Sequence, residues 1–376
     1  MEFNALPSRP SSLSPSAAGA THGVLPVLSR QAQDAGLPGL DRHLLDLQLL
    51  LHEQLAEVEA AIQGTHGTTL AQRAGHHLLS AGGKRLRPLC TLLASRLGPD
   101  ADEPQARTRV RDLAVAVELV HAATLLHDDV VDLADTRRTQ PTARVLHGNE
   151  VSIFAGDWLL VEALRRICAT GVDGLVPLAL ATIEQMIFAE VEQSQRARSL
   201  AHDRAGYFRV IDGKTAALFR WAMRAGARAG HTDTATEEAL VGFGGALGLA
   251  FQLTDDALDF DGDAQKTGKP LLADLAEGKV TLPLILLLDA NPEYLCDIEL
   301  LHAAGLDAEV RSSDAWQAAQ RRVLAGLQTT GAIAEARRVA ARYAEDAAAA
   351  LRDLPGHAPE RAALVAVAET LAARTS

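Results

Sequence analysis

The sequence predicts an all-α protein, and three observations support this prediction. Hydrophobic residues make up 48% of the 376 residues, while aromatic residues make up only 4%. Ala and Leu dominate the apolar positions, and both lose little conformational freedom in a helix. Apolar residues recur at helical spacing over most of the chain, and no alternation typical of a strand is sustained. The length fits one large helical domain or two ordinary ones.

The expected elements begin after an N-terminal tail. Residues 1–38 are rich in Ser, Pro, Ala and Gly without an apolar period, so we expect a disordered tail and one folded domain over residues 39–376. Asp41 is a candidate N-cap for a helix that runs through Leu51. Further helices are predicted over residues 69–80, 86–97, 107–133, 150–169, 173–199, 203–228, 235–260, 281–289, 313–328, 330–353 and 358–373. Gly and Pro residues separate these segments.

Net charge and cysteine spacing exclude several classes of protein. The chain carries 48 acidic and 36 basic residues, a net charge of −12. This argues against nucleic-acid binding, because backbone phosphates require clustered basic charge. The cysteines Cys90, Cys168 and Cys296 are too far apart for a metal-ligand pattern or a disulfide framework. No apolar run reaches the length of a transmembrane helix, and no secretory signal opens the chain, so a cytoplasmic protein is expected.

Two acidic clusters repeat one pattern, Asp-Asp-x-x-Asp. The first comprises Asp128, Asp129 and Asp132, and the second comprises Asp255, Asp256 and Asp259. Residues four apart share a helix face, so each cluster presents two stacked carboxylates that repel one another unless a cation relieves them. Oxygen ligands without Cys or His suit Mg²⁺, which binds one or two carboxylates together with substrate phosphates. The alternative, an acidic surface run, is weakened by the recurrence of the same cluster after strongly apolar residues.

Basic residues flank both acidic clusters. Lys84 and Arg87 lie in a Gly82-Gly83 turn before an apolar helix, where they can converge on an anion. A solvated basic turn is the alternative reading of that loop. The other flanking cations are Arg137 and Arg138 after the first cluster, Lys214 before the second, and Lys269 and Lys279 after it. Two diphosphates with bridging metal ions would require this arrangement of charges.

Together these residues resemble the trans-polyprenyl diphosphate synthase (polyprenyl synthetase) family over roughly residues 45–375. The matching motifs are Gly-Gly-Lys-Arg-x-Arg-Pro at 82–88, the aspartate motif at 128–132, Arg137-Arg138, Pro141-Thr142, Ala155-Gly156-Asp157, Glu190-x-x-Gln193, Lys214-Thr215-Ala216, Phe251-Gln252 with the aspartate motif at 255–259, Gly268-Lys269, Asp274, and Gly278-Lys279-x-Thr281-Leu282-Pro283. No unrelated family that we know joins these elements in this order.

The resemblance implies the isoprenoid synthase fold, a single-domain helical bundle around a deep central cavity into which both aspartate motifs point. It also implies the roles of individual residues. The catalytic residues would be Asp128, Asp129, Asp132, Asp255, Asp256 and Lys214, with Asp128, Asp132 and Asp255 as the metal ligands. Isopentenyl diphosphate would bind at Lys84, Arg87, His121 and Arg138, and the allylic diphosphate at Arg137, Lys214, Thr215, Gln252 and Lys269. A homodimer is expected, as are about three Mg²⁺ ions per site that Mn²⁺ can replace.

These parts predict a reaction that needs no strong side-chain base. Metal ions and cations stabilise the leaving diphosphate while the allylic C–O bond breaks. The double bond of isopentenyl diphosphate attacks the resulting carbocation, and a proton is lost from its C2. An apolar cavity keeps water away from the cation.

Three small side chains before the first aspartate motif bear on product length. Val120, Ala123 and Thr124 are not aromatic, and in the resembling family bulk just before this motif gives short products. We therefore predict a product longer than geranylgeranyl diphosphate, which a membrane can take up. A shorter-chain synthase is the alternative, because side chains on facing helices can also close a tunnel.

Two positions depart from the family pattern. Thr139-Gln140 stand where the family usually has Gly, often followed by Lys. Thr adopts positive φ less readily than Gly, so we expect a reshaped loop around Arg138. Ala189 replaces a Gly that is often found before Glu190, a change that a helix should tolerate.

Three other functions are weighed against this one. A class I terpene cyclase usually keeps one aspartate-rich motif and has an Asn/Ser/Glu metal site as the second, whereas here both are aspartate clusters. A regulatory subunit of a heteromeric synthase tends to lose aspartates, and all six are present. A di-metal oxidase bundle, which would need pairs of Glu-x-x-His ligands on facing helices, is the third alternative, and it does not account for the two aspartate clusters.

Overall fold

The structure, a computed structural model, describes residues 38–138, 140–261, 271–303, 305, 307–354 and 358–372. Within these ranges side chains are described from Leu51 onward, apart from those of residues 261, 308 and 358. The elements are α2 (Pro38–Gln63), α3 (Leu70–Ser80), α4 (Leu86–Ser95), α5 (Pro104–Val131), β1 (Thr136–Arg137), β2 (Gln140–Pro141), α6 (Ala143–His147), α7 (Asn149–Ala169), α8 (Leu175–Ser199), α9 (Arg204–Ile211), the π-helix η2 (Asp212–Ala216), α10 (Ala217–Ala229), α11 (Thr234–Asp261), α13 (Ala273–Ala276), α14 (Leu282–Ala290), the 3₁₀-helix η3 (Pro292–Tyr294), α15 (Leu295–Ala303), α16 (Ala308–Arg311), α17 (Asp314–Thr329), α18 (Ala332–Ala350) and α19 (Ala358–Ala372).

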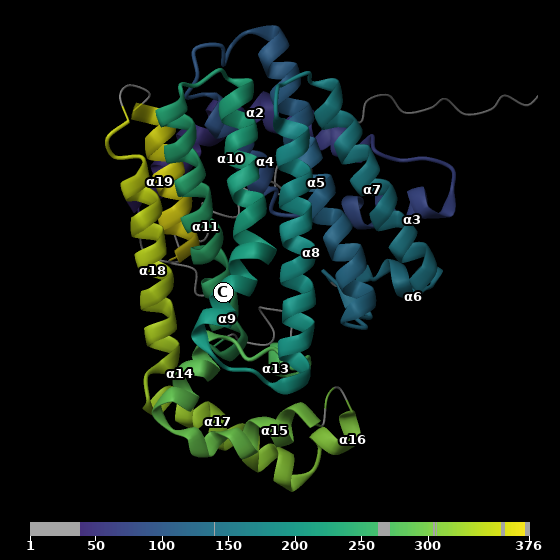
Figure 1. Cartoon of the computed structure of the whole chain (residues 1–376), viewed down its shortest axis with the longest axis vertical. Helices are drawn as coiled ribbons and strands as arrows, with labels where there is room; N and C mark the ends of the chain where they lie inside the picture. Colours follow the sequence, from purple (N-terminus) through teal and green to yellow (C-terminus); the bar gives the residue numbers. More distant parts are fainter. Residues whose placement is uncertain are drawn as a thin grey trace, which may run out of the picture.

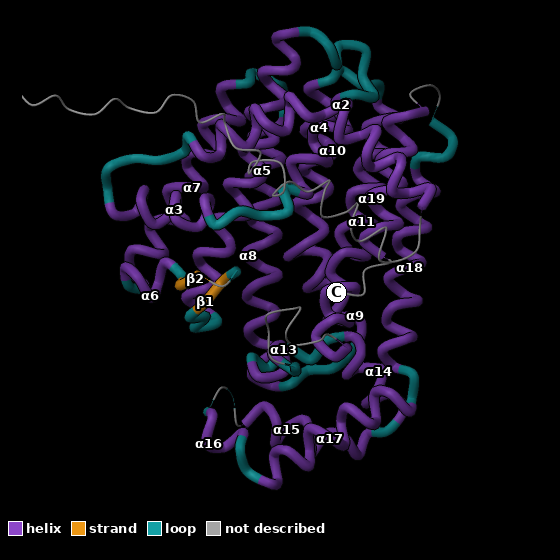
Figure 2. The backbone as a smooth tube through the Cα atoms, turned by 180° about the vertical axis from the view of Figure 1, so that it is seen from behind, coloured by secondary structure: helices purple, strands orange, loops and turns teal. Residues whose placement is uncertain are grey.

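The long helices form a bundle with a lower tier. α5 packs along α7, α10 contacts both α4 and α11, and α18 lies against α11. α15, α16 and α17 lie across the lower end of these helices (Figure 1). Within the described residues the only strands are β1 and β2, a two-residue antiparallel hairpin near α6 (Figure 2). The prediction of an all-α protein with the isoprenoid synthase fold is confirmed.

Two hydrophobic cores hold the bundle and the tier. The upper core is built mainly from α4, α5, α10 and α11 and contains Leu93, Phe219 and Phe243, all fully buried. The lower core joins α9, α14, α15 and α17 through residues such as Leu284 and Val323. Helices α11 and α18 contribute residues to both cores. They therefore hold the upper and the lower core in a fixed position relative to one another.

Several helices begin where local sequence satisfies their free N–H groups. Thr69 accepts a hydrogen bond from the Gln72 N–H, and the Gln72 side chain accepts one from the Thr69 N–H, a capping box that starts α3. Asp203 caps α9 in the same way through the N–H of Gly206 at 2.7 Å. Pro104 occupies the first turn of α5, where its missing N–H is not needed.

The structure corrects several predicted boundaries. The helix predicted over 203–228 is divided into α9, η2 and α10. α2 begins at Pro38, so Asp41 lies inside its first turn instead of at its start. α6, α13, α15 and α16 were not predicted, because stretches of four to nine residues are too short to establish a helical period.

The predicted N-terminal tail up to residue 37 lies outside the described residues, as do Thr139 and Lys269. Among the residues that are described, no helix combines the length and the apolar character needed to cross a membrane.

Candidate active site

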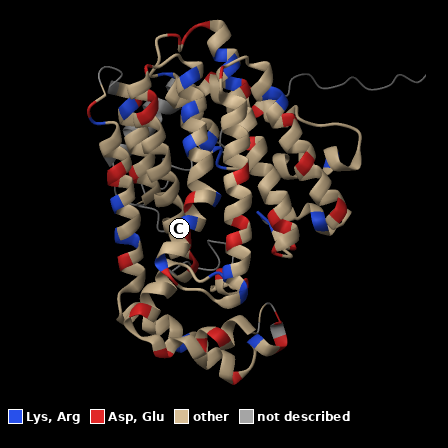
Figure 3. Cartoon of the chain, in the orientation of Figure 1, with Lys and Arg blue, Asp and Glu red and all other residues tan. Residues whose placement is uncertain are grey.

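The two aspartate motifs lie at the ends of two long helices. Asp128 and Asp129 are in the last turn of α5, and Asp132 follows as its C-cap, with its N–H bonded to the Asp128 carbonyl at 2.8 Å. Asp255 and Asp256 are near the end of α11. Charged residues of both signs gather at this level of the bundle, around α9 and α13 (Figure 3).

Two lysines connect the first motif to elements around the second. Lys214 of η2 lies with its Nζ 3.6 Å from Asp128 Oδ2, and Lys279, in the segment after α13, lies 3.0 Å from Asp132 Oδ2. Lys214 also contacts Glu190 at 2.6 Å and donates to Gln193 at 2.8 Å, both on α8. The first motif is therefore held by cations that come from the opposite side of the site.

Burial, and to a smaller extent neighbouring carboxylates, shift the pKa of Asp128 in the first motif. Burial raises the pKa of Asp128 to about 6, with Glu190 and Asp132 adding to the rise and Lys214 opposing it. Burial alone would lower the pKa of Lys279, but the charges of Asp132 and Glu277 raise it above its ordinary value. Carboxylates under this strain gain stability from a further cation.

Asp129 has a supporting position. Its side chain is 1% exposed and accepts a hydrogen bond from Arg137 Nε at 2.8 Å. Burial raises the pKa of Asp129, while Arg137 lowers it. The Asp129–Arg137 pair thus ties the end of α5 to strand β1.

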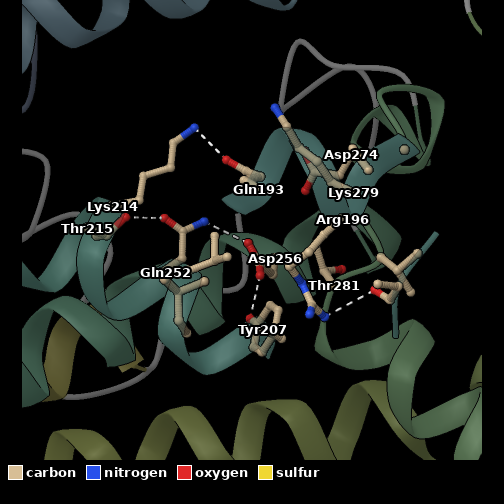
Figure 4. Close-up of a pocket in the computed structure, with 16 residues that line it drawn as sticks. Gln193, Arg196, Tyr207, Lys214, Thr215, Gln252, Asp256, Asp274, Lys279 and Thr281 are labelled. Atoms are coloured by element: carbon tan, nitrogen blue, oxygen red, sulfur yellow. Dashed lines mark hydrogen bonds between the residues drawn. The ribbon is translucent and has the colours of Figure 1, made fainter. Parts of the chain in front are cut away.

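A chain of hydrogen bonds supports the second motif (Figure 4). Thr215 donates to Gln252 Oε1 at 2.8 Å, and the Gln252 amide donates to Asp256 Oδ1 at 2.7 Å. Tyr207 donates its hydroxyl to the other oxygen of Asp256 at 2.5 Å. Burial, with the nearby charge of Asp274, raises the pKa of Asp256 to about 7.

A pocket opens beside this chain of hydrogen bonds. Its walls come from α8, α9, η2, α11 and the segment around Gly278. The polar side chains on the wall include Gln193, Lys214, Thr215, Gln252, Asp274 and Lys279. The pocket thus contains three of the residues predicted to bind the allylic diphosphate.

Three of the residues predicted to bind isopentenyl diphosphate, Arg87, His121 and Arg138, lie near one another beside α5. Arg87 is 9% exposed, and its guanidinium lies 4.6 Å from the centre of the Phe219 ring. Burial, together with the charges of Arg87 and Arg138, holds the pKa of His121 well below its usual range. Arg138 has a left-handed backbone with φ of 51°, and its guanidinium lies against Gly83 of the basic loop.

Comparison with known proteins decides the family. Residues 68–311 match the polyprenyl synthetase family. The chain belongs to this family.

Individual relatives agree with that assignment. The polyprenyl synthetase described here is 35% identical over 299 residues to heptaprenyl diphosphate synthase component 2 of Geobacillus stearothermophilus. The matched region covers 80% of this chain and 88% of that protein. The chain is 34% identical over 323 residues to octaprenyl diphosphate synthase of Escherichia coli, covering 85% and 95%.

A solved structure supports the fold independently. The polyprenyl synthase of Caulobacter crescentus, crystallised with calcium and isoprenyl diphosphate, superposes with a TM-score of 0.78 at 35% identity, covering 88% of this chain and 97% of that one. The predicted transferase activity, that of a prenyltransferase acting as a prenyl diphosphate synthase, is confirmed.

The roles of several predicted residues of this polyprenyl synthetase stay predictions. Lys84 and Asp255 are described and engaged with neighbours, but their roles stay predictions. Lys269 lies outside the described residues, and so does Thr139, so the expected reshaping of the loop stays a prediction. Val120 and Ala123 are buried at 2% and 0%, and Thr124 bonds to the His121 carbonyl at 2.8 Å.

Sequence reasoning missed two residues of this polyprenyl synthetase site. Tyr207 is not among the predicted site residues, although a tyrosine two turns before Lys214 on an apolar helix is a signal for a buried hydroxyl. Lys279 was recognised as a flanking cation but was given no place in the site. Neither contact follows from spacing, since both join elements far apart in sequence.

The donor set fits the metal that the family implies. The side chains at the first motif offer only carboxylate oxygens, which Mg²⁺ prefers. Within the described part of the chain no three His, Cys, Asp or Glu side chains already converge as a closed metal cluster.

Proposed function

We propose that this protein is a magnesium-dependent trans-polyprenyl diphosphate synthase that extends an allylic diphosphate with isopentenyl diphosphate. The observation that carries the proposal is the pairing of Lys214 with Asp128 and of Lys279 with Asp132. Lys214 and Lys279 line the pocket together with Asp256 of the second motif, and the same two lysines contact carboxylates of the first motif. A diphosphate with divalent ions has the charge pattern to fit between them.

Three aspartates would hold the metal. Asp128, Asp132 and Asp255 are the candidate ligands, with Asp129 and Asp256 held in place by Arg137 and Tyr207. When bound, Mg²⁺ neutralises charge that develops on the leaving diphosphate.

The allylic half of the reaction uses residues of the pocket. Lys214, Thr215 and Gln252 lie on its wall, and Arg137 and Lys269 complete the proposed set. Ammonium and hydroxyl donors aimed at the diphosphate favour departure of its oxygen with the electron pair of the C1–O bond. Lys279, on the same wall, joins these donors in our assignment.

The isopentenyl half uses the basic residues beside α5. Lys84, Arg87 and Arg138 would hold the diphosphate of isopentenyl diphosphate. His121 stays neutral, because its pKa lies well below the usual range, so it can donate a hydrogen bond without adding charge. The double bond then attacks C1 of the allylic cation, and a proton leaves C2 for the released diphosphate.

A product longer than geranylgeranyl diphosphate is part of the proposal. Relatives named heptaprenyl, octaprenyl and nonaprenyl diphosphate synthases support it. The small residues Val120, Ala123 and Thr124 before Asp128 support it as well, since no aromatic ring stands there. We also propose a cytoplasmic enzyme that releases its apolar product to a membrane.

Homodimer formation is supported by an apolar face on α7 and α8. Phe154, Val161, Leu180, Ile187, Phe188 and Val191 are each about half exposed or more, from 49% to 64%. On α8, Ile187, Phe188 and Val191 follow Leu180 by seven, eight and eleven residues. At this spacing the four side chains lie on one side of the helix. We call these six residues the α7–α8 face, and a second copy of the chain would cover it.

One incubation tests the proposed function. Purified protein is mixed with farnesyl diphosphate, isopentenyl diphosphate and Mg²⁺, and the products are sized by mass spectrometry. We expect polyprenyl diphosphates longer than geranylgeranyl diphosphate, and no product when EDTA is added. A cyclic hydrocarbon, or full activity in EDTA, would contradict the proposal.

A further inference from the structure

The basic loop before α4 contains a residue in an unusual conformation. Arg85, the N-cap of α4, has a left-handed backbone with φ of 48°. A non-glycine residue in this region is strained and persists only where surrounding contacts enforce it. Its two neighbours in the motif, Lys84 and Arg87, are the ones assigned to isopentenyl diphosphate.

Contacts of the Arg85 side chain enforce that conformation. The guanidinium is 8% exposed and donates to Glu118 Oε1 on α5 at 2.7 Å. Nε and Nη2 donate to the two oxygens of Glu59 on α2, at 2.9 and 3.2 Å, and Nη2 also donates to the Leu79 carbonyl of α3 at 2.9 Å. One side chain therefore joins the loop to three helices.

Glu118 has a second set of neighbours. It is 4% exposed, and its charge raises the pKa of Arg87 and of Arg138 against the lowering effect of burial. Arg85 and Arg138 both lie against Gly83, since a Cβ there would be 3.0 Å from Nη1 of Arg85 and 3.2 Å from both terminal nitrogens of Arg138. The buried carboxylate of Glu118 thus interacts with three arginines, Arg85, Arg87 and Arg138. Without it, their like charges would repel one another.

We propose that the Arg85–Glu118 pair is the positioning element of the isopentenyl diphosphate half of the site. Arg85 locks the loop so that Lys84 and Arg87 hold their places before the ligand arrives, and Glu118 offsets the repulsion among the arginines. Neither residue binds the ligand itself. This inference rests on the proposed function, because it takes the residues beside α5 as the isopentenyl diphosphate site.

The test separates positioning from plain stability. Arg85→Met alone would leave Glu118 buried without its partner, which is strongly destabilising. The double variant Arg85→Met with Glu118→Gln removes both charges and keeps both volumes, an exchange that folded proteins often tolerate. Binding of isopentenyl diphosphate alone and of farnesyl diphosphate alone is measured by calorimetry with Mg²⁺, beside a melting curve for each protein.

We expect the double variant to melt near the wild type and to bind isopentenyl diphosphate about tenfold more weakly or worse, the loss expected for one charge-assisted hydrogen bond. Its Kd for farnesyl diphosphate should change by less than about twofold, because only the loop is affected. Arg85→Lys keeps the charge but loses the fork that reaches both glutamates, so its KM for isopentenyl diphosphate should rise selectively with little change in kcat.

A matched pair on the same helix serves as control. Arg96, the C-cap of α4, lies 3.5 Å from Glu360 of α19, and both are mostly buried. Arg96→Met with Glu360→Gln should likewise melt near the wild type, and it should leave both Kd values at wild type.

Three results would overturn the inference: a well-folded double variant with a wild-type Kd for isopentenyl diphosphate, equal weakening of both ligands, or an unfolded double variant together with an Arg85→Lys protein of wild-type KM. Wild-type protein that binds neither diphosphate would instead refute the proposed function.

Discussion

At the scale of single residues, the lack of a side chain at Gly156 makes room for His127, the residue just before the first aspartate motif. Gly156 of α7 lies where a Cβ would overlap the His127 ring of α5. His127 Nε2 bonds to the Ile153 carbonyl at 3.1 Å and lies 3.4 Å from Asp157 Oδ1. Because His127 directly precedes Asp128 in α5, we expect its contacts with α7 to influence the orientation of the Asp128 carboxylate. These contacts explain why a glycine and an aspartate stand together in the Ala155-Gly156-Asp157 motif.

Gly156→Ala tests that reason. Overpacking should cost about 1–3 kcal/mol of stability, and displacement of His127 should lower kcat about tenfold or more by moving Asp128. Gly242→Ala is the control, since its Cβ would meet only Ala350 at 3.9 Å. That change should be neutral or stabilise by up to about 1 kcal/mol. Steady-state kinetics and thermal melts decide, and unchanged kcat in Gly156→Ala would contradict the account.

Ala123 is the residue that we propose limits product length most directly. It has no exposed surface and lies on α5 before Asp128. Ala123→Phe should shorten the products to near farnesyl or geranylgeranyl length, because the ring blocks the path of the apolar tail. If Ala123 instead fills a closed core, the variant should lose about 1–3 kcal/mol of stability and make the same product. Mass analysis read beside a melting curve distinguishes the two outcomes.

At the scale of elements, the π-helix η2 is the feature that places Lys214 and Thr215. A π-turn adds a residue to the helix and is often found at functional sites. Gly213 lies against α8, where its Cβ would be 2.7 Å from the Cβ of Ala189. Arg220 of α10 holds the start of η2 through Asp212 at 2.6 and 2.9 Å. The Ala that replaces the family's usual Gly at 189 is tolerated because its neighbour is itself a glycine.

That contact gives a reciprocal test. Gly213→Ala should force η2 away from α8 and raise KM for the allylic diphosphate about tenfold. Adding Ala189→Gly to the same protein should restore it, because the second change removes the clashing methyl group. Ala189→Gly alone should cost only the intrinsic helix penalty of glycine, about 1 kcal/mol. A double variant as impaired as Gly213→Ala would argue against the contact as the cause.

At the scale of the whole molecule, the site lies where the upper and lower cores meet. Asp128 belongs to a helix of the upper core, whereas Tyr207 and Leu275, near Lys279, belong to the lower core. Only the packing of the two cores brings Lys279 to Asp132. For this reason the motifs were predictable from sequence, since each lies within one helix or loop, while the contacts of Tyr207 and Lys279 were not. The π-turn also escaped prediction, because one added residue leaves the helical period almost unchanged.

The α7–α8 face gives the prediction at this scale. Phe188, 64% exposed, is its most exposed member, and Phe188→Asp should convert a dimer into a monomer by placing a charge in an apolar interface. Leu300→Asp is the control, because Leu300 is an exposed apolar residue, at 39%, on α15 and outside that face. Light scattering reads the mass directly. A Phe188→Asp protein that stays dimeric, or a wild-type protein that is monomeric, would contradict the proposal that a second copy covers this face.

The lysine bridges also bear on how the enzyme can be handled. Because Lys214 and Lys279 contact Asp128 and Asp132 from within the chain, they offset part of the carboxylate repulsion that a divalent ion would otherwise relieve. We therefore expect the protein to stay folded in EDTA and to regain its activity when Mg²⁺ is added back.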